Sequence, residues 1–286
     1  MTTSMTDRAP RRWLITGVSS GLGRALAEYV LELGDIVIGT LRQESQLAAF
    51  AALASGRAFP VQLDVTDDEA VQPALAQVID AVGGLDVVVN NAGYALIGAI
   101  EDATLAEARL QMETNLFGAL KIIRTAIPYL RARDGGRIIN IASVAGSMGM
   151  PIYGHYCASK FALVGLSAAL AQELAPFNIR VTVLEPGGFR TNFGSSSLRV
   201  TANPSPLYEE RTLGMAKRMA DFGRMAENDP RKGAAAIVAL SEMADPPVHA
   251  AMGTDGLKYV RAALAARLAD YERAEPLLSA TAADPR

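Results

Sequence analysis

A tyrosine and a lysine four residues apart, in the segment YGHYCASKF, could carry out proton transfer. Tyr156 and Lys160 stand in a stretch with helical spacing of apolar residues, so their side chains should share one face of the helix. A free phenol has a pKa of about 10 and is a poor base near neutrality, but an adjacent ammonium stabilises the phenolate. A shift of roughly two units takes about 2.7 kcal/mol. The pair predicts acid-base chemistry in which Lys160 lowers the pKa of Tyr156.

A glycine-rich segment near the start of the chain, TGVSSGLG at residues 16–23, could bind phosphate. Gly17 allows a tight turn, Gly21 removes a side chain where a phosphate would approach the backbone, and Gly23 permits close packing of helix on strand. A helix that begins here directs its positive end at a pyrophosphate. An ordinary turn would use the same glycines, but their position between the first strand and the first helix favours a dinucleotide site.

The elements that position these residues alternate between strands and helices. Nearly continuous apolar runs, typical of strands buried on both faces, lie at 12–17, 35–40, 58–64, 85–90, 136–143 and 179–187. Apolar residues at helical spacing predict helices at about 21–33, 43–54, 67–81, 104–132 and 155–175, the third of them capped by Thr66. Right-handed crossovers then give an α/β fold with a doubly wound (Rossmann) parallel sheet of about seven strands flanked by helices.

The same alternation predicts a single domain over residues 12–275. Residues 1–11 are polar and should be disordered, and residues 276–286 should fray. Between about 188 and 229 the alternation stops, and Gly, Ser and Pro are followed by an amphipathic stretch without a strand pattern. An insertion of this length predicts a lid or a disordered loop. Helices resume near 230 and 256.

Composition argues against several functional classes. The net charge is −3, and the arginines are scattered without aromatic interleaving, so we expect no nucleic-acid partner. The single cysteine, Cys157, offers neither an intrachain disulfide nor a metal-ligand pair, which predicts no metal site and fits a reducing compartment. The start of the chain lacks the apolar region of a secretory signal, and WLITGV is too short to span a membrane. We therefore expect a cytoplasmic protein without a membrane span.

Taken together, the motifs resemble the short-chain dehydrogenase/reductase family. The TGxxxGxG loop, NNAG at 90–93, PGGFRT at 186–191 and the Tyr156/Lys160 pair cover residues 12–192 in order, with a family-like C-terminal helix beyond them. The resemblance implies an NAD(P)-dependent alcohol dehydrogenase or carbonyl reductase. It implies Tyr156 as the general acid or base, and Lys160 as the group that also holds the nicotinamide ribose. Ser143 would orient and polarise the substrate oxygen, and Asn115 would support Lys160 through a water.

The family pattern also implies a set of cofactor contacts. Asp64 and Val65 would hold the adenine, the PGGFRT backbone would meet the carboxamide, and Thr191 would meet the nicotinamide or a phosphate. The full set comprises Gly17, Ser19, Ser20, Gly21, Leu22, Gly23, Arg42, Asp64, Val65, Asn91, Ala92, Gly93, Tyr156, Lys160, Pro186, Gly187 and Thr191.

The end of the second strand bears on which cofactor is bound. An enzyme that selects NAD usually carries an acid there for the ribose 2′-hydroxyl, whereas this chain has Leu41 followed by Arg42. A guanidinium suits a 2′-phosphate, so we predict NADP(H) over NAD(H). Ser20, the other position where such enzymes often carry a base, is neutral, so the prediction depends on one cation. An NAD(H)-preferring enzyme with a solvated Arg42 is the alternative.

The substrate pocket should be largely apolar. Its expected walls are Tyr94, Leu96, Met148, Met150, Ile152, Tyr153, Phe193 and parts of 194–225. Flexible methionines suit a hydrophobic ketone or alcohol and some promiscuity, although the same residues could simply pack a lid onto the domain. The helix at 155–175 is apolar nearly all round and must be covered on more than one side. The family resemblance implies that it pairs across a two-fold axis in a homodimer or homotetramer; a monomer covered by 194–225 is the alternative.

Two other functions are compatible with the same motifs. A non-catalytic protein that senses NADP(H) could use this fold, since a fold does not fix a function. The complete set of Ser143, Tyr156 and Lys160 disfavours that reading. A related lyase or epimerase that uses the cofactor transiently matches the glycine spacing and the C-terminal region less well.

Overall fold

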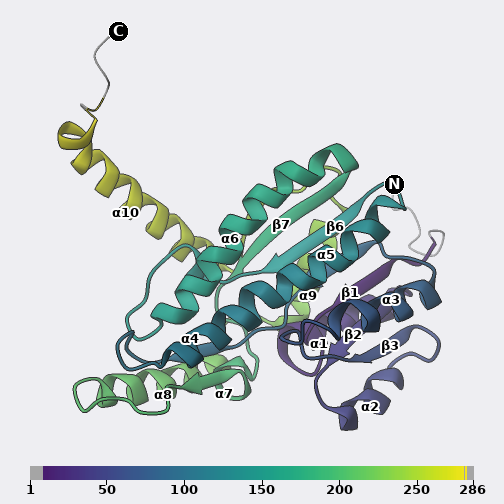
Figure 1. Ribbon diagram of the computed structural model, residues 1–286, viewed down its shortest axis with the longest axis horizontal. Coiled ribbons are helices and arrows are strands. Elements are labelled where there is room, and N and C mark those ends of the chain that lie inside the picture. Colours follow the sequence, from purple (N-terminus) through teal and green to yellow (C-terminus); the bar gives the residue numbers. More distant parts are fainter. Residues whose placement is uncertain (1–8, 280, 282–286) are drawn as a thin grey trace.

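The computed structural model describes residues 9–279 and residue 281 (Figure 1). The predicted disorder of the N-terminal segment and fraying of the C-terminus concern residues that lie largely outside this part of the chain. No helix in the described ranges is both long enough and apolar enough to cross a membrane.

A parallel sheet of seven strands forms the centre, in the order β3-β2-β1-β4-β6-β7-β9. This confirms the doubly wound α/β fold. The strands are β1 Arg12–Ile15, β2 Ile36–Leu41, β3 Ala58–Gln62, β4 Val87–Asn90, β6 Gly136–Ile141, β7 Ile179–Pro186 and β9 His249–Met252. The predicted strand runs were correct to within a few residues; β9 was missed because HAAM carries little strand signal.

Helices cover both faces of the sheet, as Figure 1 shows. Side chains alternate along each strand, so Trp13 and Ile15 of β1 pack under α1 Gly21–Glu32 and α9 Pro230–Glu242, while Leu14 packs on the other face. The opposite face is covered by α3 Val71–Val82, α5 Gly118–Arg131 and α6 Gly154–Leu174. The remaining helices are α2 Leu47–Ala51, α4 Leu105–Met112, α7 Phe193–Ser196, α8 Glu209–Met225 and α10 Thr254–Leu278.

Two helix predictions were wrong in detail. Thr66 does not cap a helix: α3 begins at Val71, and the Asp67 carboxylate accepts hydrogen bonds from the backbone N–H groups of Glu69 and Ala70 in the turn before it. The long helix at 104–132 is divided by a π-helical turn, Glu113–Phe117, between α4 and α5. Apolar spacing continues through this turn, so the sequence pattern gives no sign of the break.

The insertion contains a strand that the sequence did not reveal. β8 Leu198–Val200 pairs in parallel with β5 Ala95–Ile97 and forms a second, two-stranded sheet. Three residues between polar neighbours carry too little periodicity to predict a strand. The pairing fixes the insertion over the residues that follow β4.

Candidate active site

The glycine loop after β1 has the backbone that a phosphate site requires. Gly17 and Gly21 have φ of 71° and 62°, values that favour glycine. A Cβ on Gly23 would lie 2.3 Å from Nδ2 of Asn91 and 2.5 Å from the carbonyl oxygen of Gly17, so only glycine fits there. No side chain caps α1 at Ser20, and the first turn holds no acidic residue. The positive end of α1 is therefore open to an anion.

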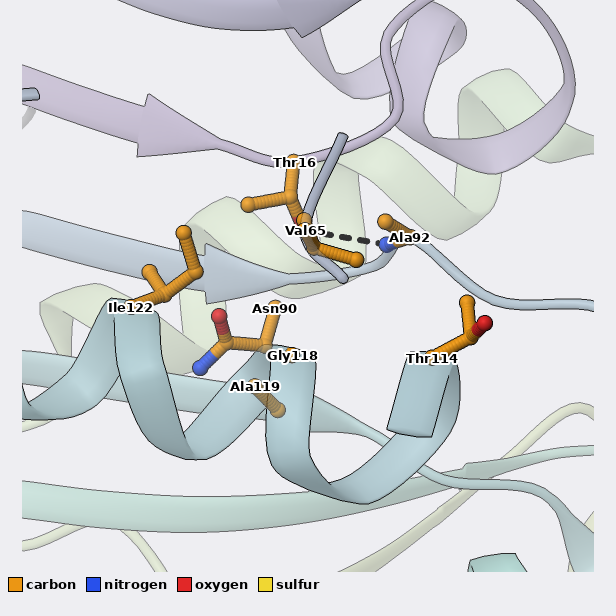
Figure 2. Close-up of a pocket in the computed structure, with 8 residues that line it drawn as sticks. All are labelled: Thr16, Val65, Asn90, Ala92, Thr114, Gly118, Ala119 and Ile122. Carbon is orange, nitrogen blue, oxygen red and sulfur yellow. Dashed lines mark hydrogen bonds between the residues drawn. The ribbon is translucent and has the colours of Figure 1, made fainter. Parts of the chain in front are cut away.

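Thr16 joins this loop to the NNAG segment after β4. Its hydroxyl accepts hydrogen bonds from the backbone N–H groups of Asn91 at 2.9 Å and Ala92 at 3.0 Å, and Figure 2 shows the second of these. The Asn91 amide returns bonds to the carbonyl oxygens of Thr16 and Gly17. Sequence reasoning missed Thr16 as a positioning residue, although it is the first letter of the glycine motif.

Val65, one of the two predicted adenine contacts, lines the same pocket as Thr16 and Ala92 (Figure 2). Val65 is buried and packs against Gly118, where a Cβ would lie 2.7 Å from a Val65 methyl. The Asp64 carboxylate is exposed and accepts hydrogen bonds from the backbone N–H and the hydroxyl of Thr66, at 3.0 and 2.8 Å. Arg42 follows the buried Leu41 directly, is exposed, and forms no ion pair within the described part of the chain.

Ser143, Tyr156 and Lys160 come together at the carboxyl end of β6. Ser143 follows β6 and begins a short 3₁₀ helix, and its hydroxyl lies near enough to Tyr156, in the first turn of α6, to affect the pKa of that phenol. One turn further on, the Lys160 ammonium lies 5.8 Å from the Tyr156 ring centroid and donates to the carbonyl oxygen of Ile141 at 2.8 Å. Tyr156 and Lys160 are each 5% exposed.

Burial controls the acidity of both groups. It raises the pKa of Tyr156 to about 12, against the opposing effect of the nearby Ser143 hydroxyl, and it lowers the pKa of Lys160 to about 8. The prediction that Lys160 lowers the pKa of Tyr156 was therefore wrong for this arrangement. Burial disfavours the charged form of each side chain. At this separation, the attraction between the ammonium and the phenolate is too weak to offset that cost. Near neutral pH, Tyr156 holds its proton and is able to donate it.

Asn115 lies in the π-helical turn and ties three segments together. Its amide oxygen accepts from the Tyr94 N–H at 3.1 Å, and its amide nitrogen donates to the Tyr94 carbonyl and to the Ser159 hydroxyl, both at 3.0 Å. A Cβ on Gly93 would lie 3.0 Å from Oδ1 of Asn115 and 3.7 Å from Nζ of Lys160, so both groups border this glycine. π-Helical turns occur frequently at functional sites because they redirect side chains.

The PGGFRT segment after β7 is held from the C-terminal part of the chain. Gly187 lies so close to Asp255 that a Cβ would approach its carboxylate to 2.3 Å, and the Gly188 N–H donates to the same carboxylate at 2.7 Å. The Asn228 amide donates to the Gly188 carbonyl at 2.6 Å and to Asp255 at 2.7 Å. Sequence reasoning missed Asp255 and Asn228, because no local pattern shows that residues so distant along the chain meet this loop.

Aromatic rings and the insertion surround Tyr156. The Tyr153 ring meets it edge-on at 5.7 Å, and the Phe193 ring of α7 lies 6.2 Å away. Tyr153 is 3% exposed, and its hydroxyl has no hydrogen-bond partner among the described residues. Around them packs an apolar cluster that also draws on the 150–153 turn and on α8, with Met150, Ile152, Leu198, Met215 and Met219.

The turn before α6 is strained. Ile152 has a φ of 67°, which is unfavourable for a β-branched residue, and its carbonyl accepts from the Gly98 N–H at 2.9 Å. Such strain costs about 1–3 kcal/mol and is often found near active sites.

Two other predicted pocket residues lie after β4. Leu96 is buried, and the Tyr94 ring stacks under the Arg199 guanidinium at 4.9 Å.

The sheet order, the open glycine loop and the serine, tyrosine and lysine beside it define a class of nicotinamide-dependent oxidoreductases. The family model described as short chain dehydrogenase matches residues 11–199. The chain belongs to the short-chain dehydrogenase/reductase family.

Individual relatives cover nearly the whole chain. An oxidoreductase of Botryotinia fuckeliana, BOA17, is 36% identical over 271 residues, which is 94% of this chain and 98% of that protein. A 3-ketodihydrosphingosine reductase of Bacteroides thetaiotaomicron is 38% identical over 245 residues, 85% of this chain and 88% of its own.

Two solved structures share the fold. A short-chain dehydrogenase from Streptomyces avermitilis is 36% identical, covers 96% of this chain and 99% of its own, and has a TM-score of 0.89. One from Burkholderia cenocepacia, solved in complex with NADP, is 26% identical, covers 92% of this chain and 97% of its own, and has a TM-score of 0.70.

Proposed function

We propose that this protein is an NADP(H)-dependent carbonyl reductase or alcohol dehydrogenase that acts on a largely apolar substrate, with Tyr156 as its general acid or base. The observation that carries the proposal is the convergence of Ser143, Tyr156 and Lys160 beside the open N-terminus of α1. The residues fit a dinucleotide, because the glycines let the loop backbone approach a phosphate and the N-terminus of α1 can stabilise its charge.

The reaction divides its work between cofactor and side chains. Bound NADPH supplies the hydride that the substrate carbon accepts. The Ser143 hydroxyl and the Tyr156 phenol donate hydrogen bonds to the carbonyl oxygen and polarise it. Tyr156 then gives its proton to that oxygen, which suits a phenol that is protonated near neutral pH. Lys160 would hold the nicotinamide ribose and place a positive charge near the phenolate left behind, with Asn115 supporting it through a water.

The preference for NADP(H) is supported by Arg42. Its guanidinium is exposed directly after β2, where an acid would favour NAD(H), and Leu41 at the strand end is apolar and buried. A planar cation can bind a 2′-phosphate through two hydrogen bonds. The proposal also includes the other predicted cofactor contacts, among them Ser19, Leu22, Pro186 and Thr191.

The environment of Tyr156 supports an apolar substrate. The cluster around it consists of aliphatic, aromatic and methionine side chains, which adapt to substrates of different shape. The relative named 3-ketodihydrosphingosine reductase agrees with a ketone attached to an apolar body. The Tyr153 hydroxyl is the polar exception, and a substrate oxygen near the reacting carbon would give it the partner it lacks among the described residues.

A turnover screen tests the function. Purified protein should oxidise NADPH in the presence of apolar ketones, or reduce NADP⁺ with the corresponding secondary alcohols. Tyr156→Phe removes the proton donor while keeping the ring, and should lower kcat by at least about 100-fold, the lower end of the range for general acid-base catalysis. NADPH binding should stay within about threefold of the wild type, because the hydroxyl contributes at most one hydrogen bond to the bound cofactor.

One result would favour the alternative function, a non-catalytic sensor of NADP(H). A protein that binds NADPH tightly but turns over no compound in a broad panel would support that reading. If the Tyr156→Phe variant keeps appreciable activity, the protein is still an enzyme, but Tyr156 is not its general acid or base. A cytoplasmic location and a homo-oligomeric state complete the proposal.

A further inference from the structure

Helix α10 extends away from the rest of the molecule (Figure 1). Its first turns contact the body, where Gly256 and Val260 are buried. Further along, the Arg267 guanidinium donates to the Ser147 carbonyl at 2.8 Å and lies over the Phe161 ring at 5.2 Å. These contacts occupy one side of the helix and fix its direction. Another side carries large apolar residues that nothing in the described structure covers.

The uncovered side is a regular stripe, which we call the α10 stripe. Its members follow one another at alternating steps of four and three residues, the spacing of a helix face that packs on another helix. Its apolar members are 42 to 65% exposed. The stripe consists of Leu257, Arg261, Leu264, Leu268, Tyr271, Glu275 and Leu278.

The order of apolar and charged residues in the α10 stripe is the same from either end, except that the charge changes sign. From the centre at Leu268, the next residues outward are Leu264 and Tyr271, then Arg261 and Glu275, and finally Leu257 and Leu278. We propose that α10 packs antiparallel against α10 of a second copy of this chain, about a two-fold axis at Leu268. Each apolar residue then meets an apolar residue, and Arg261 of each copy faces Glu275 of the other.

The charges select this partner and this direction. Arg261 and Glu275 lie fourteen positions apart on the helix, about 21 Å at 1.5 Å per residue, so the two cannot pair within one chain. Neither forms an ion pair among the described residues. A parallel pair of helices would instead place Arg261 on Arg261 and Glu275 on Glu275. An anionic membrane is a poorer partner, because the helix carries four basic and four acidic residues and has no net charge.

This interface is distinct from the two-fold contact at α6 that the family resemblance implies. It is also independent of the proposed catalytic activity, since its test measures association and not turnover.

Charge reversal gives a specific test by analytical ultracentrifugation over a range of protein concentrations. Arg261→Glu and Glu275→Arg should each raise the dissociation constant of the α10 contact more than about tenfold, because each places like charges together twice in the dimer. The double variant Arg261→Glu/Glu275→Arg restores opposite charges and should recover most of the affinity. Lys258→Glu, on the same helix but off the stripe, is the matched control and should associate as the wild type does.

A cross-link tests the register. Leu268→Cys places a thiol on the proposed axis, so mild oxidation should give a disulfide-linked dimer. Lys258→Cys should give none, and the native Cys157 is buried. A wild-type protein that is monomeric at all concentrations, or that binds phosphatidylcholine vesicles as a monomer, would overturn the proposal. Association that neither single charge reversal weakens would also overturn it, since the copies would then meet elsewhere.

Discussion

Lys160 is a side chain whose burial has a measurable cost. Its pKa falls from 10.5 to about 8 because the ammonium is withdrawn from water. Below about pH 8 the folded and unfolded chains both hold the proton, and the folded protein bears the whole cost of burying the charge. Between about pH 8 and 10.5 only the unfolded chain holds it, so this group makes the free energy of unfolding rise with pH across that window.

Replacing this lysine should therefore stabilise the protein while damaging its proposed activity. Lys160→Met should raise the free energy of unfolding at pH 7 by about 1–3 kcal/mol, the gain from removing the charge less the lost hydrogen bond to Ile141. Urea unfolding at pH 7 and at pH 9.5 measures the difference, which should shrink at the higher pH. Comparing the two proteins cancels the titration of Tyr156, Cys157 and Glu185, whose pKa values are raised by burial in both.

The exposed Lys258 gives the control for this experiment, because Lys258→Met removes a lysine without removing a buried charge. It should leave the free energy of unfolding within about 0.5 kcal/mol of the wild type at both pH values. A Lys160→Met variant that is less stable than the wild type at pH 7 would show that the hydrogen bond outweighs the buried charge.

Arg42 sets a second expectation at this scale. Arg42→Ala should raise the Michaelis constant for NADPH by about tenfold or more and change that for NADH by less than about twofold, because only the 2′-phosphate needs the cation. Steady-state kinetics with both cofactors measures the two constants. Arg24→Ala, which removes an arginine engaged with Glu28 on α1, controls for a general loss of positive charge. If Arg42→Ala affects the Michaelis constants for both cofactors equally, Arg42 does not bind the 2′-phosphate.

At the scale of elements, the junction between α1 and the strands depends on one glycine. A methyl group at Gly23 would overlap the Asn91 amide and the Gly17 carbonyl, which are joined by a hydrogen bond. Gly23→Ala should therefore lower the free energy of unfolding by about 1–3 kcal/mol and weaken NADPH binding. Gly165→Ala in α6 is the matched control, since nothing lies within 4 Å of the added methyl, and it should stabilise by up to about 1 kcal/mol.

The two variants are compared by urea unfolding and by NADPH titration. The result that contradicts the packing argument is a Gly23→Ala protein as stable as the wild type, because the Asn91 amide would then have room to move. If Gly23→Ala changes the affinity for NADPH but not the stability, the substitution acts by altering the backbone of the glycine loop.

The elements that were predictable are those with strong local patterns. Long aliphatic runs located β1, β4, β6 and β7, and the Tyr156/Lys160 spacing located the reacting face of α6. The π-helical turn at Asn115 was not predictable, because its residues keep the apolar spacing of an α-helix. The acidity of Tyr156 was predicted with the wrong sign, because the sequence shows the neighbouring lysine but not how deeply both are buried.

At the scale of the whole molecule, the site is assembled by topology. Parallel strands bring the ends of β1, β4, β6 and β7 to one edge of the sheet, so residues from Thr16 to Thr191 meet there. The PGGFRT segment is supported by Asn228, at the end of the insertion, and by Asp255, beyond it, and only the folded chain shows these contacts. The insertion then covers the same edge, with Phe193 against Tyr156.

The covering insertion should open more readily than the sheet. Its apolar contacts form a cluster separate from the two large clusters that hold the sheet, so α7 and α8 can separate from Tyr156 without exposing the main core. Tyr156 is 5% exposed, so such an opening would widen the path by which a substrate reaches it. Hydrogen exchange should therefore be faster in residues 193–225 than in β1, β4 and β6.

Adding NADPH together with a substrate or product analogue should slow exchange at 193–225 and leave the sheet nearly unchanged, since ligands that fill the site stabilise its closed form. The exposed part of α10 beyond Arg267 is an internal control, because it lies outside the cover and its exchange should not respond to these ligands. Exchange at 193–225 as slow as in β4 would show that the insertion unfolds only with the domain. The substrate would then have to enter by a path that leaves Phe193 in place.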